Sequence, residues 1–174
     1  MVLHVSSNIY LESLAQHQAI PLYDLANRNR AYLGKWLPWV EHMHDSSFIS
    51  NFIKNSLQRY AQGTEEAFVI VFENKIVGRI GLYKIDTYNC ACEIGYWIGE
   101  EFAGNGIVSD CTKALMQHAH NVYHIHRVEI RCATDNERSK KIPVRLGFAL
   151  EGTLKDAEKM HGNYLNIEVY AYLQ

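Results

Sequence analysis

A strand–helix–strand pattern over residues 91–134 constrains the fold of this chain more than any other feature. The run "ACEIGYWIG" is typical of a buried strand. From Ile107 onward, apolar side chains recur at helical spacing, at Val108, Cys111, Leu115, Ala119 and Val122. The run "HRVEIRCAT", residues 126–134, alternates like a second strand. Two strands joined through one helix form a right-handed parallel crossover. The pattern therefore predicts an α/β fold with a parallel pair inside its sheet.

Two more amphipathic helices are expected before this unit. Residues 17–34 place apolar side chains on one face, with Pro21 tolerable in the first turn: Leu22, Leu25 and Ala26. Residues 45–62 carry a second apolar stripe behind the N-cap residue Asp45: Phe48, Phe52, Ile53 and Leu57. Pro38 interrupts the segment between them, which we expect to be irregular.

Most residues outside the crossover and the first two predicted helices are expected to form strands. The short run "IYLESL" is expected to form one, and four longer runs follow, at 66–73, 76–86, 148–158 and 164–173. Asn74 and Lys75 are predicted to turn the first long pair into a hairpin. A short helix over 136–146 ends at Gly147. The predicted order is β-α-α-β-β-β-α-β-α-β-β.

The composition favours one cytoplasmic domain with a full hydrophobic core. The 174 residues are 48% hydrophobic and 21% charged, and no repeat or linker divides them, so we predict a single domain over residues 1–174. A net charge of −2 gives no support to nucleic-acid binding, and no apolar run is long enough to span a membrane. No export signal is evident, so the cysteines are interpreted as reduced core residues: Cys90, Cys92, Cys111 and Cys132.

Two glycines, Gly104 and Gly106, stand where the first strand of the crossover gives way to its helix. Glycine inside a helix costs about 1 kcal/mol relative to alanine, so the pair "GNG" needs a reason. Backbone N–H groups at a helix N-terminus form a natural phosphate seat, and glycine lets a ligand approach them closely. A tight strand-to-helix turn is the alternative. The run matches neither the P-loop nor the dinucleotide fingerprint, where Asp110 replaces the third glycine.

Four blocks of sequence, in order, resemble the GNAT superfamily of N-acetyltransferases, and within it the RimJ/RimL type. They are "CEIGYWIGEEFAGNGI", "DNERS" at 135–139, "GFALEG" at 147–152 and "LKDAE" at 154–158. The resemblance covers nearly the whole chain. It implies a mixed central sheet of about six to seven strands, splayed between strands 4 and 5 and flanked by about four helices.

The resemblance also implies acetyl-CoA as cosubstrate. Pantetheine is expected to pair with the backbone of "EIGYWI", and the pyrophosphate to sit on the amides of residues 103–108. Glu101 stands where the family has a glutamine or arginine, which removes a basic side chain near the phosphates. The residues implied to bind coenzyme A are Trp97, Ile98, Ala103, Gly104, Asn105, Gly106, Ile107, Val108, Asn136 and Ser139.

Acyl transfer to an amine needs a base for the amine and an acid for the departing thiolate. Many GNAT enzymes use a tyrosine as the acid, but Pro143 occupies that place here. In the RimL type a serine is the proposed substitute and a glutamate the proposed base, and these align with Ser139 and Glu158. Ser139 as an ordinary helix serine and Glu158 as a solvated loop carboxylate are the alternatives. Tyr96 and Tyr164 are the next candidates for the acid.

The acceptor is expected to lie between the segment "RNRAYLGKWLPWV" and a loop over 155–164. Trp36 and Trp39 would form one wall, unless they pack the helix onto the sheet, and Glu158 would contact the amine. We predict acetylation of a protein N-terminal amine, with a ribosomal protein as the expected acceptor. A small-amine acetyltransferase acting on polyamines or aminoglycosides, and a coenzyme-binding module without turnover, stay open, as does the oligomeric state. Since His118 and His120 face apart on a helix and no cysteine pair has zinc-site spacing, no metal site is expected.

Overall fold

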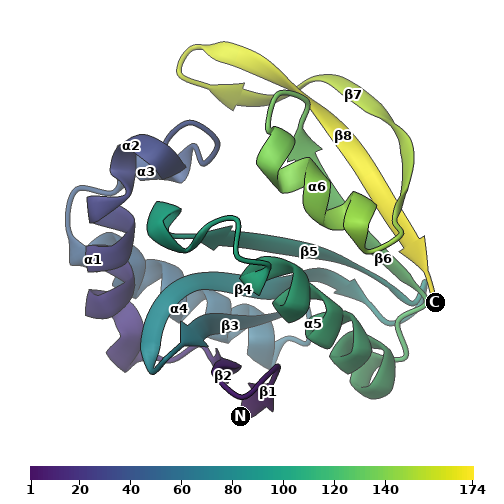
Figure 1. Ribbon diagram of the computed structural model, residues 1–174, viewed down its shortest axis with the longest axis horizontal. Helices are drawn as coiled ribbons and strands as arrows, with labels where there is room; N and C mark the ends of the chain where they lie inside the picture. Colours follow the sequence, from purple (N-terminus) through teal and green to yellow (C-terminus); the bar gives the residue numbers. More distant parts are fainter.

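A computed structural model describes all 174 residues and shows one eight-stranded mixed sheet with helices on both faces (Figure 1). The strand order is β1-β2-β3-β4-β5-β6-β8-β7. The strands are β1 (Val2–His4), β2 (Ile9–Ser13), β3 (Glu65–Phe72), β4 (Lys75–Asp86), β5 (Ala91–Ile98), β6 (Arg127–Ala133), β7 (Ala149–Met160) and β8 (Asn163–Leu173). The helices are α1 (Ala19–Arg28), α2 (Arg30–Leu33), α3 (Trp39–His42), α4 (Ser46–Ala61), α5 (Ile107–Tyr123) and α6 (Glu137–Arg145).

The predicted α/β class and element order are confirmed, but the strand count was too low. The additional strand is β1, a three-residue edge strand paired with β2, too short to show a periodicity of its own. Four helices have nine or more residues, and α2 and α3 are single turns of four. None of the helices combines the length and the apolar character that crossing a membrane requires.

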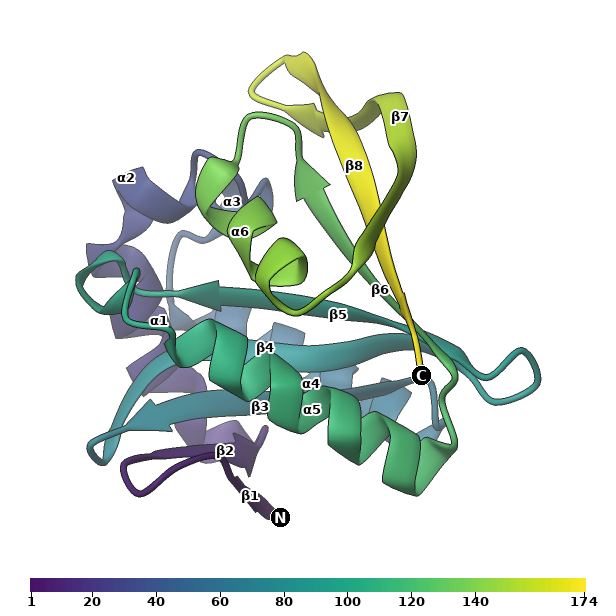
Figure 2. The same ribbon diagram turned by 45° about the vertical axis from the view of Figure 1, so that its right-hand side comes forward.

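The sheet separates two hydrophobic cores. Helix α5 covers one face, over β2, β4 and β5, while α1 and α4 cover the other, as Figures 1 and 2 show. Leu115 of α5 and Ile53 of α4 are both fully buried, one in each core. Helix α6 lies beside α5 and contacts β6. Both sides of the central strands are therefore covered, which explains the nearly uninterrupted apolar run of β3.

Two adjacent carboxylates on β3 are buried and belong to opposite sides of the sheet. Glu66 accepts a 3.0 Å hydrogen bond from the Tyr123 hydroxyl and lies 2.7 Å from Nε2 of His118, both on α5. Glu65 is bound by Arg79 of β4 and by Arg59 of α4. Burying a charge is unfavourable unless it is paired, and both carboxylates are paired. The contact with Glu66 gives His118 a structural role.

The crossover opens a gap in the middle of the sheet. Strands β5 and β6 run parallel, but their pairing is restricted to Ala91–Glu93 with Arg127–Glu129. Beyond these three pairs, the outer half of β5, from Ile94 to Ile98, has no partner on its β6 side. The predicted parallel crossover and splay are both present. They leave a row of free backbone groups facing a cleft.

Several predicted details of the helices were wrong, for local reasons. The first helix is broken at Asn29, whose φ of −100° and ψ of 15° are not helical. The buried residues of α4 are Ile49, Ile53 and Ser56, whereas Leu57 is 40% exposed, so the buried face lies to one side of the predicted stripe. Val122, near the end of α5, is exposed as well. Asp45 does cap α4, because its side chain accepts the Ser47 N–H at 2.8 Å.

Two turns and one cysteine also differ from expectation. The β3–β4 hairpin turns at Glu73 and Asn74, both with positive φ, rather than at residues 74 and 75. The expected loop over 155–164 is mostly strand, because β7 continues to Met160 and turns sharply into β8. Cys90 lies in a turn and is only half-buried, while the other three cysteines are buried and reduced.

Candidate active site

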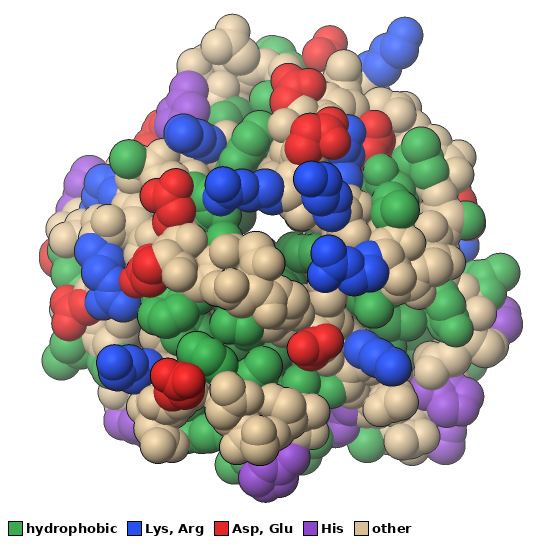
Figure 3. Space-filling view, viewed as in Figure 1, with side chains coloured by type: hydrophobic (Ala, Val, Ile, Leu, Met, Phe, Trp, Pro, Cys, Tyr) green, Lys and Arg blue, Asp and Glu red, His purple; other side chains and the backbone are tan.

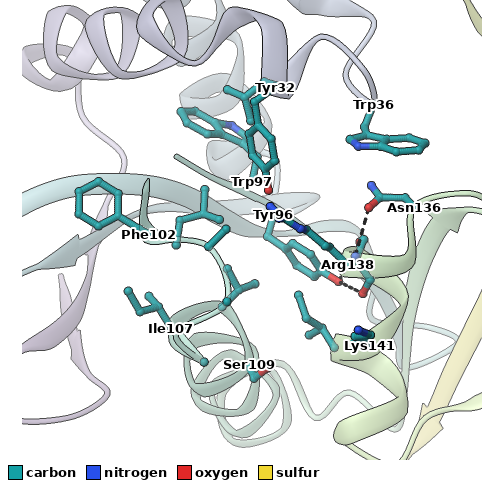
Figure 4. Close-up of a pocket in the computed structure, with 18 of the residues that line it drawn as sticks. Tyr32, Trp36, Tyr96, Trp97, Phe102, Ile107, Ser109, Asn136, Arg138 and Lys141 are labelled. Atoms are coloured by element: carbon teal, nitrogen blue, oxygen red, sulfur yellow. Dashed lines mark hydrogen bonds between the residues drawn. The ribbon is translucent and has the colours of Figure 1, made fainter. Parts of the chain in front are cut away.

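A cavity of about 430 Å³ lies at the splay between β5 and β6. Strand β5, the loop after it and the start of α5 form one side, α6 forms another, and α2 with the residues that follow it closes the top (Figure 4). All the predicted coenzyme residues except Asn105 line it: Trp97, Ile98, Ala103, Gly104, Gly106, Ile107, Val108, Asn136 and Ser139. Asn105 is exposed, and its side-chain amide donates to the Phe102 carbonyl at 3.3 Å.

The two glycines form an open, positively polarised end of α5. Gly104 and Gly106 have φ values of +88° and +79°, a left-handed backbone that side-chain-bearing residues avoid. No heavy atom lies within 4 Å of a Cβ built at either position, so the backbone faces free space. The first turn of a helix has unpaired N–H groups and about half a positive charge. This end of α5 therefore suits a phosphate group.

Helix α6 turns a basic face toward the same cavity, a feature absent from the sequence-based predictions. Arg138, Lys141 and Arg145 line the cavity, and their i, i+3, i+7 spacing could have indicated a common helix face. Arg138 also crosses the cleft, because its guanidinium carbon lies 5.8 Å from the centre of the Tyr32 ring of α2. The three cations place positive charge opposite the N-terminus of α5.

Glu101 forms an ion pair with Arg28 of α1. Its carboxylate lies 3.2 Å from Nε of Arg28, and it does not line the cavity. The neighbouring Asn29 is 6% exposed and joins α1 to the same loop, because its amide donates to the Leu25 carbonyl at 3.0 Å and accepts from the Glu100 N–H at 2.8 Å. The Glu101 carboxylate is therefore paired with Arg28 and lies outside the cavity lining.

Three polar side chains from three elements meet at the inner end of the cavity. The Tyr96 hydroxyl, on β5, donates to the backbone carbonyl of Ser139, on α6, at 3.2 Å and lies 3.3 Å from Oγ of the same serine (Figure 4). Sγ of Cys132, on β6, is 3.2 Å from the same Oγ. Asn136 caps α6 by accepting the Ser139 N–H at 3.2 Å, which fixes the first turn. Burial raises the pKa of Tyr96 well above its usual range and raises that of Cys132, so both keep their protons near neutral pH.

The predicted acceptor residues are not all brought together. Trp36 lines the main cavity, but Trp39 lines a second cavity of about 160 Å³ on the α1–α4 side, which shares Trp97 with the first. The rings of Trp39 and Trp97 are 6.0 Å apart. Glu158 lies on β7 opposite Leu165, outside the lining of either cavity. It is half-buried, and desolvation raises its pKa above the usual carboxyl value.

Comparison with known proteins identifies the family. Residues 8–149 match the acetyltransferase (GNAT) domain family. The chain belongs to the GNAT family. It is 31% identical over 167 residues to the ribosomal-protein-serine acetyltransferase of Escherichia coli (strain K12), covering 96% of this chain and 93% of that protein. This GNAT chain is therefore an N-acetyltransferase, as predicted.

Solved structures agree with the assignment to the GNAT fold. The chain superposes on the ribosomal α-N-protein acetyltransferase RimL, held in a coenzyme A disulfide complex, with a TM-score of 0.96 at 29% identity, covering 99% of this chain and 98% of that one. The microcin C7 self-immunity acetyltransferase in complex with acetyl-CoA and AMP gives a TM-score of 0.94 at 31% identity, covering 98% and 94%. The predicted RimJ/RimL resemblance is confirmed.

The GNAT chain departs from the common family pattern where the acid is expected. Pro143, which the family resemblance aligns with the usual tyrosine, is buried within α6. Tyr96 reaches the same helix from β5 instead, through its contacts with Ser139. Tyr164, the other candidate, is 59% exposed and does not line the cavity. No cluster of three or more His, Cys, Asp or Glu side chains is arranged to hold a metal ion.

Proposed function

We propose that this enzyme transfers the acetyl group of acetyl-CoA to the N-terminal amine of a protein, with a ribosomal protein in the cytoplasm as the acceptor. The observation that carries the proposal is one cavity that unites the glycine-lined N-terminus of α5, the basic face of α6 and the Tyr96–Ser139 pair. Its ends have different chemistry, one suited to phosphates and one to proton transfer. The ribosomal-protein acetyltransferases among its relatives support the choice of acceptor.

Coenzyme A fits the two halves of this cavity in one orientation. The amides at the start of α5 would hold the pyrophosphate, with Arg138, Lys141 and Arg145 balancing its charge. The free backbone edge of β5 would pair with pantetheine as a neighbouring strand does. The thioester then lies near Ser139, at the inner end of the splay.

The reaction forms a C–N bond and breaks the C–S bond of the thioester. Because Glu158 lies outside the cavity lining, it would take the proton that the attacking amine loses through water, and its raised pKa makes it a better base than an exposed carboxylate. Ser139 gives a proton to the thiolate as it leaves. The serine proton is then restored from solvent, and the Tyr96 hydroxyl, which stays protonated 3.3 Å from Ser139 Oγ, stabilises the serine oxygen until then.

A small-molecule amine is the second candidate acceptor. It is favoured by the similarity to the self-immunity enzyme, whose complex contains acetyl-CoA and AMP. The cavity next to Trp39 and Trp97 has aromatic walls and a volume of about 160 Å³, enough for a compact group. Both candidates use the same coenzyme site, so only the acceptor distinguishes them.

Competing acceptors in one assay test the proposal. Purified enzyme and acetyl-CoA are incubated with a short peptide, the same peptide with a blocked N-terminus, a whole ribosomal-protein fraction, spermidine and an aminoglycoside. Mass spectrometry follows the gain of one acetyl group. We expect the free-amine peptide and one or more ribosomal proteins to gain it, and the blocked peptide to stay unchanged. Acetylation of the small amines alone would reject the protein acceptor and leave the coenzyme site in place.

A further inference from the structure

One side chain ties the tip of the β7–β8 hairpin to the opposite wall of the cleft. Nε2 of His161 lies 2.7 Å from the carbonyl oxygen of Gly34, just after α2, and Nδ1 lies 2.9 Å from Oε2 of Glu41 on α3. In Figure 1 the hairpin tip lies above the α2–α3 segment, and Figure 3, in the same view, shows an opening through the molecule below the hairpin. We call this contact of His161 with Gly34 and Glu41 the clasp.

The clasp requires a doubly protonated imidazole. A carbonyl oxygen and a carboxylate can only accept hydrogen bonds, so both ring nitrogens must donate, and a neutral imidazole has only one N–H. Glu41 is the charged group that contacts the ring from α3, and it has no other ion pair. The segment after α2 contributes only the Gly34 carbonyl, since Lys35 makes no ion pair. The bond to Gly34, followed by the contact with Glu41, raises the pKa of His161 above its usual value.

Pairing of β8 with β6 anchors the base of the hairpin from Ile167 to Leu173, but little besides the clasp holds its tip. Every residue of β7 before Met160 is exposed or half-buried, and two register shifts interrupt its pairing with β8. Met160, 5% exposed, is the buried apolar residue next to the clasp. Segments with few buried contacts open locally at low free energy. An exposed ion pair contributes little to global stability, but here it acts on a segment that is itself weakly held.

We propose that His161 is a positioning residue for the acceptor. While the clasp is closed, it holds the β7–β8 hairpin against the α2–α3 segment, and Glu158, three residues before His161, is held with it. When the imidazole loses its second proton, one hydrogen bond and the charge attraction are lost, and the acceptor side of the cleft loosens. The inference rests on the proposed function, because it assigns this side of the cleft to the acceptor amine.

The direction of the pH effect follows from the protonated state. Because the pKa of His161 is higher in the folded protein than the ordinary value of 6.5, the clasp is complete below that value and is lost as pH rises through the folded pKa. The amine behaves oppositely, since deprotonation near pH ~8 makes it reactive. Acceptor binding and acceptor reactivity therefore change in opposite directions with pH.

The test compares wild type with His161→Gln and Glu41→Gln. The control is His126→Gln, because His126 is also exposed and contacts a backbone oxygen, that of Gln174, at 2.7 Å, and it lines neither cavity. For each protein, KM and kcat for a free-amine peptide are measured from pH 5.5 to 8.5 at saturating acetyl-CoA, with coenzyme A affinity by calorimetry. NMR follows the imidazole titrations and the amide exchange of residues 160–162.

We expect His161→Gln to raise the peptide KM about two- to fivefold at low pH, and the difference from wild type to disappear at high pH. Coenzyme A affinity and the His126→Gln profile stay unchanged. Glu41→Gln lowers the pKa of His161, and His161→Gln speeds amide exchange at the hairpin tip. A peptide KM profile identical in wild type and His161→Gln would overturn the inference. If no peptide is acetylated, the proposed function fails. The clasp is rejected separately if the pKa of His161 is the same in Glu41→Gln as in wild type and amide exchange at the hairpin tip is the same in His161→Gln as in wild type.

Discussion

Replacing Gly106 with valine has two separable effects: it strains the left-handed backbone, which lowers stability, and it fills the open space beside the turn, which lowers affinity for a ligand. A residue with a Cβ held in the left-handed region costs about 1–2 kcal/mol. For a domain of this size each kcal/mol lowers Tm by about 2–4 °C, so we expect a total decrease of about 2–8 °C. The space lost to the side chain is a separate effect. Gly106 lines the cavity with nothing within 4 Å of its Cβ position, so the valine methyls would occupy volume that a phosphate oxygen needs.

Gly147 offers a matched control. Its φ is +82°, nothing lies within 4 Å of its Cβ position, and it lies after α6, outside the lining of the cavity. Gly147→Val should therefore lose similar stability and keep its affinity for coenzyme A. For Gly106→Val we expect Kd to rise at least about 100-fold, equivalent to about 2.7 kcal/mol. Calorimetric titration and thermal melts measure both effects. A folded Gly106→Val protein that binds coenzyme A like Gly147→Val would refute the phosphate site.

Three further predictions concern the chemistry and the fold. Ser139→Ala should lower kcat at least about tenfold and leave coenzyme A affinity within about twofold, because the serine proton is needed only as the thiolate leaves. Stopped-flow thiol release measures kcat and calorimetry measures the affinity. An unchanged kcat would move the acid role to Tyr96. Glu158→Gln should lower kcat at neutral pH, with the deficit shrinking above the amine's pKa near ~8, whereas a loss confined to KM would make Glu158 a binding carboxylate. Asp45→Ala should lower Tm by a few degrees and leave activity intact, because it removes the cap of α4; an unchanged melt contradicts this.

The central part of the fold could be predicted because its residues are buried. Strands β3 to β6 and helix α5 contribute to the cores, so apolar side chains mark them at the spacing of a strand or a helix. The hairpin β7–β8 lies at the edge of the sheet, and its outer strand has no buried face to produce such spacing. A polar run such as "KDAEKMHGNY" then resembles a loop. Only the partner strand shows that Glu158 lies opposite Leu165.

The part of the cavity formed by β5 and the start of α5 was predictable for a different reason. Its residues are close in sequence, from Trp97 to Val108, and a pair of glycines at a strand-to-helix junction indicates either a tight turn or a bound ligand. The inner end of the cavity combines Tyr96 with Ser139, which are 43 residues apart, and no local pattern joins them. The positions of Trp36 and Trp39 in two different cavities likewise depend on how the short helices α2 and α3 fold.

Asn29 has a consequence for the order of events in catalysis. It breaks the first helix, and its side-chain amide donates to the Leu25 carbonyl and accepts from the Glu100 N–H, so helices α1 and α2 are linked to the loop after β5 through one residue. We expect a ligand that orders the loop after β5 to order α2 and the residues just after it as well, and Tyr32 and Trp36 line the cleft there. The enzyme should therefore add its substrates in sequence, coenzyme first. Asn29→Ala removes these hydrogen bonds and should change ordered addition of the two substrates into random addition. Product-inhibition kinetics would show the change.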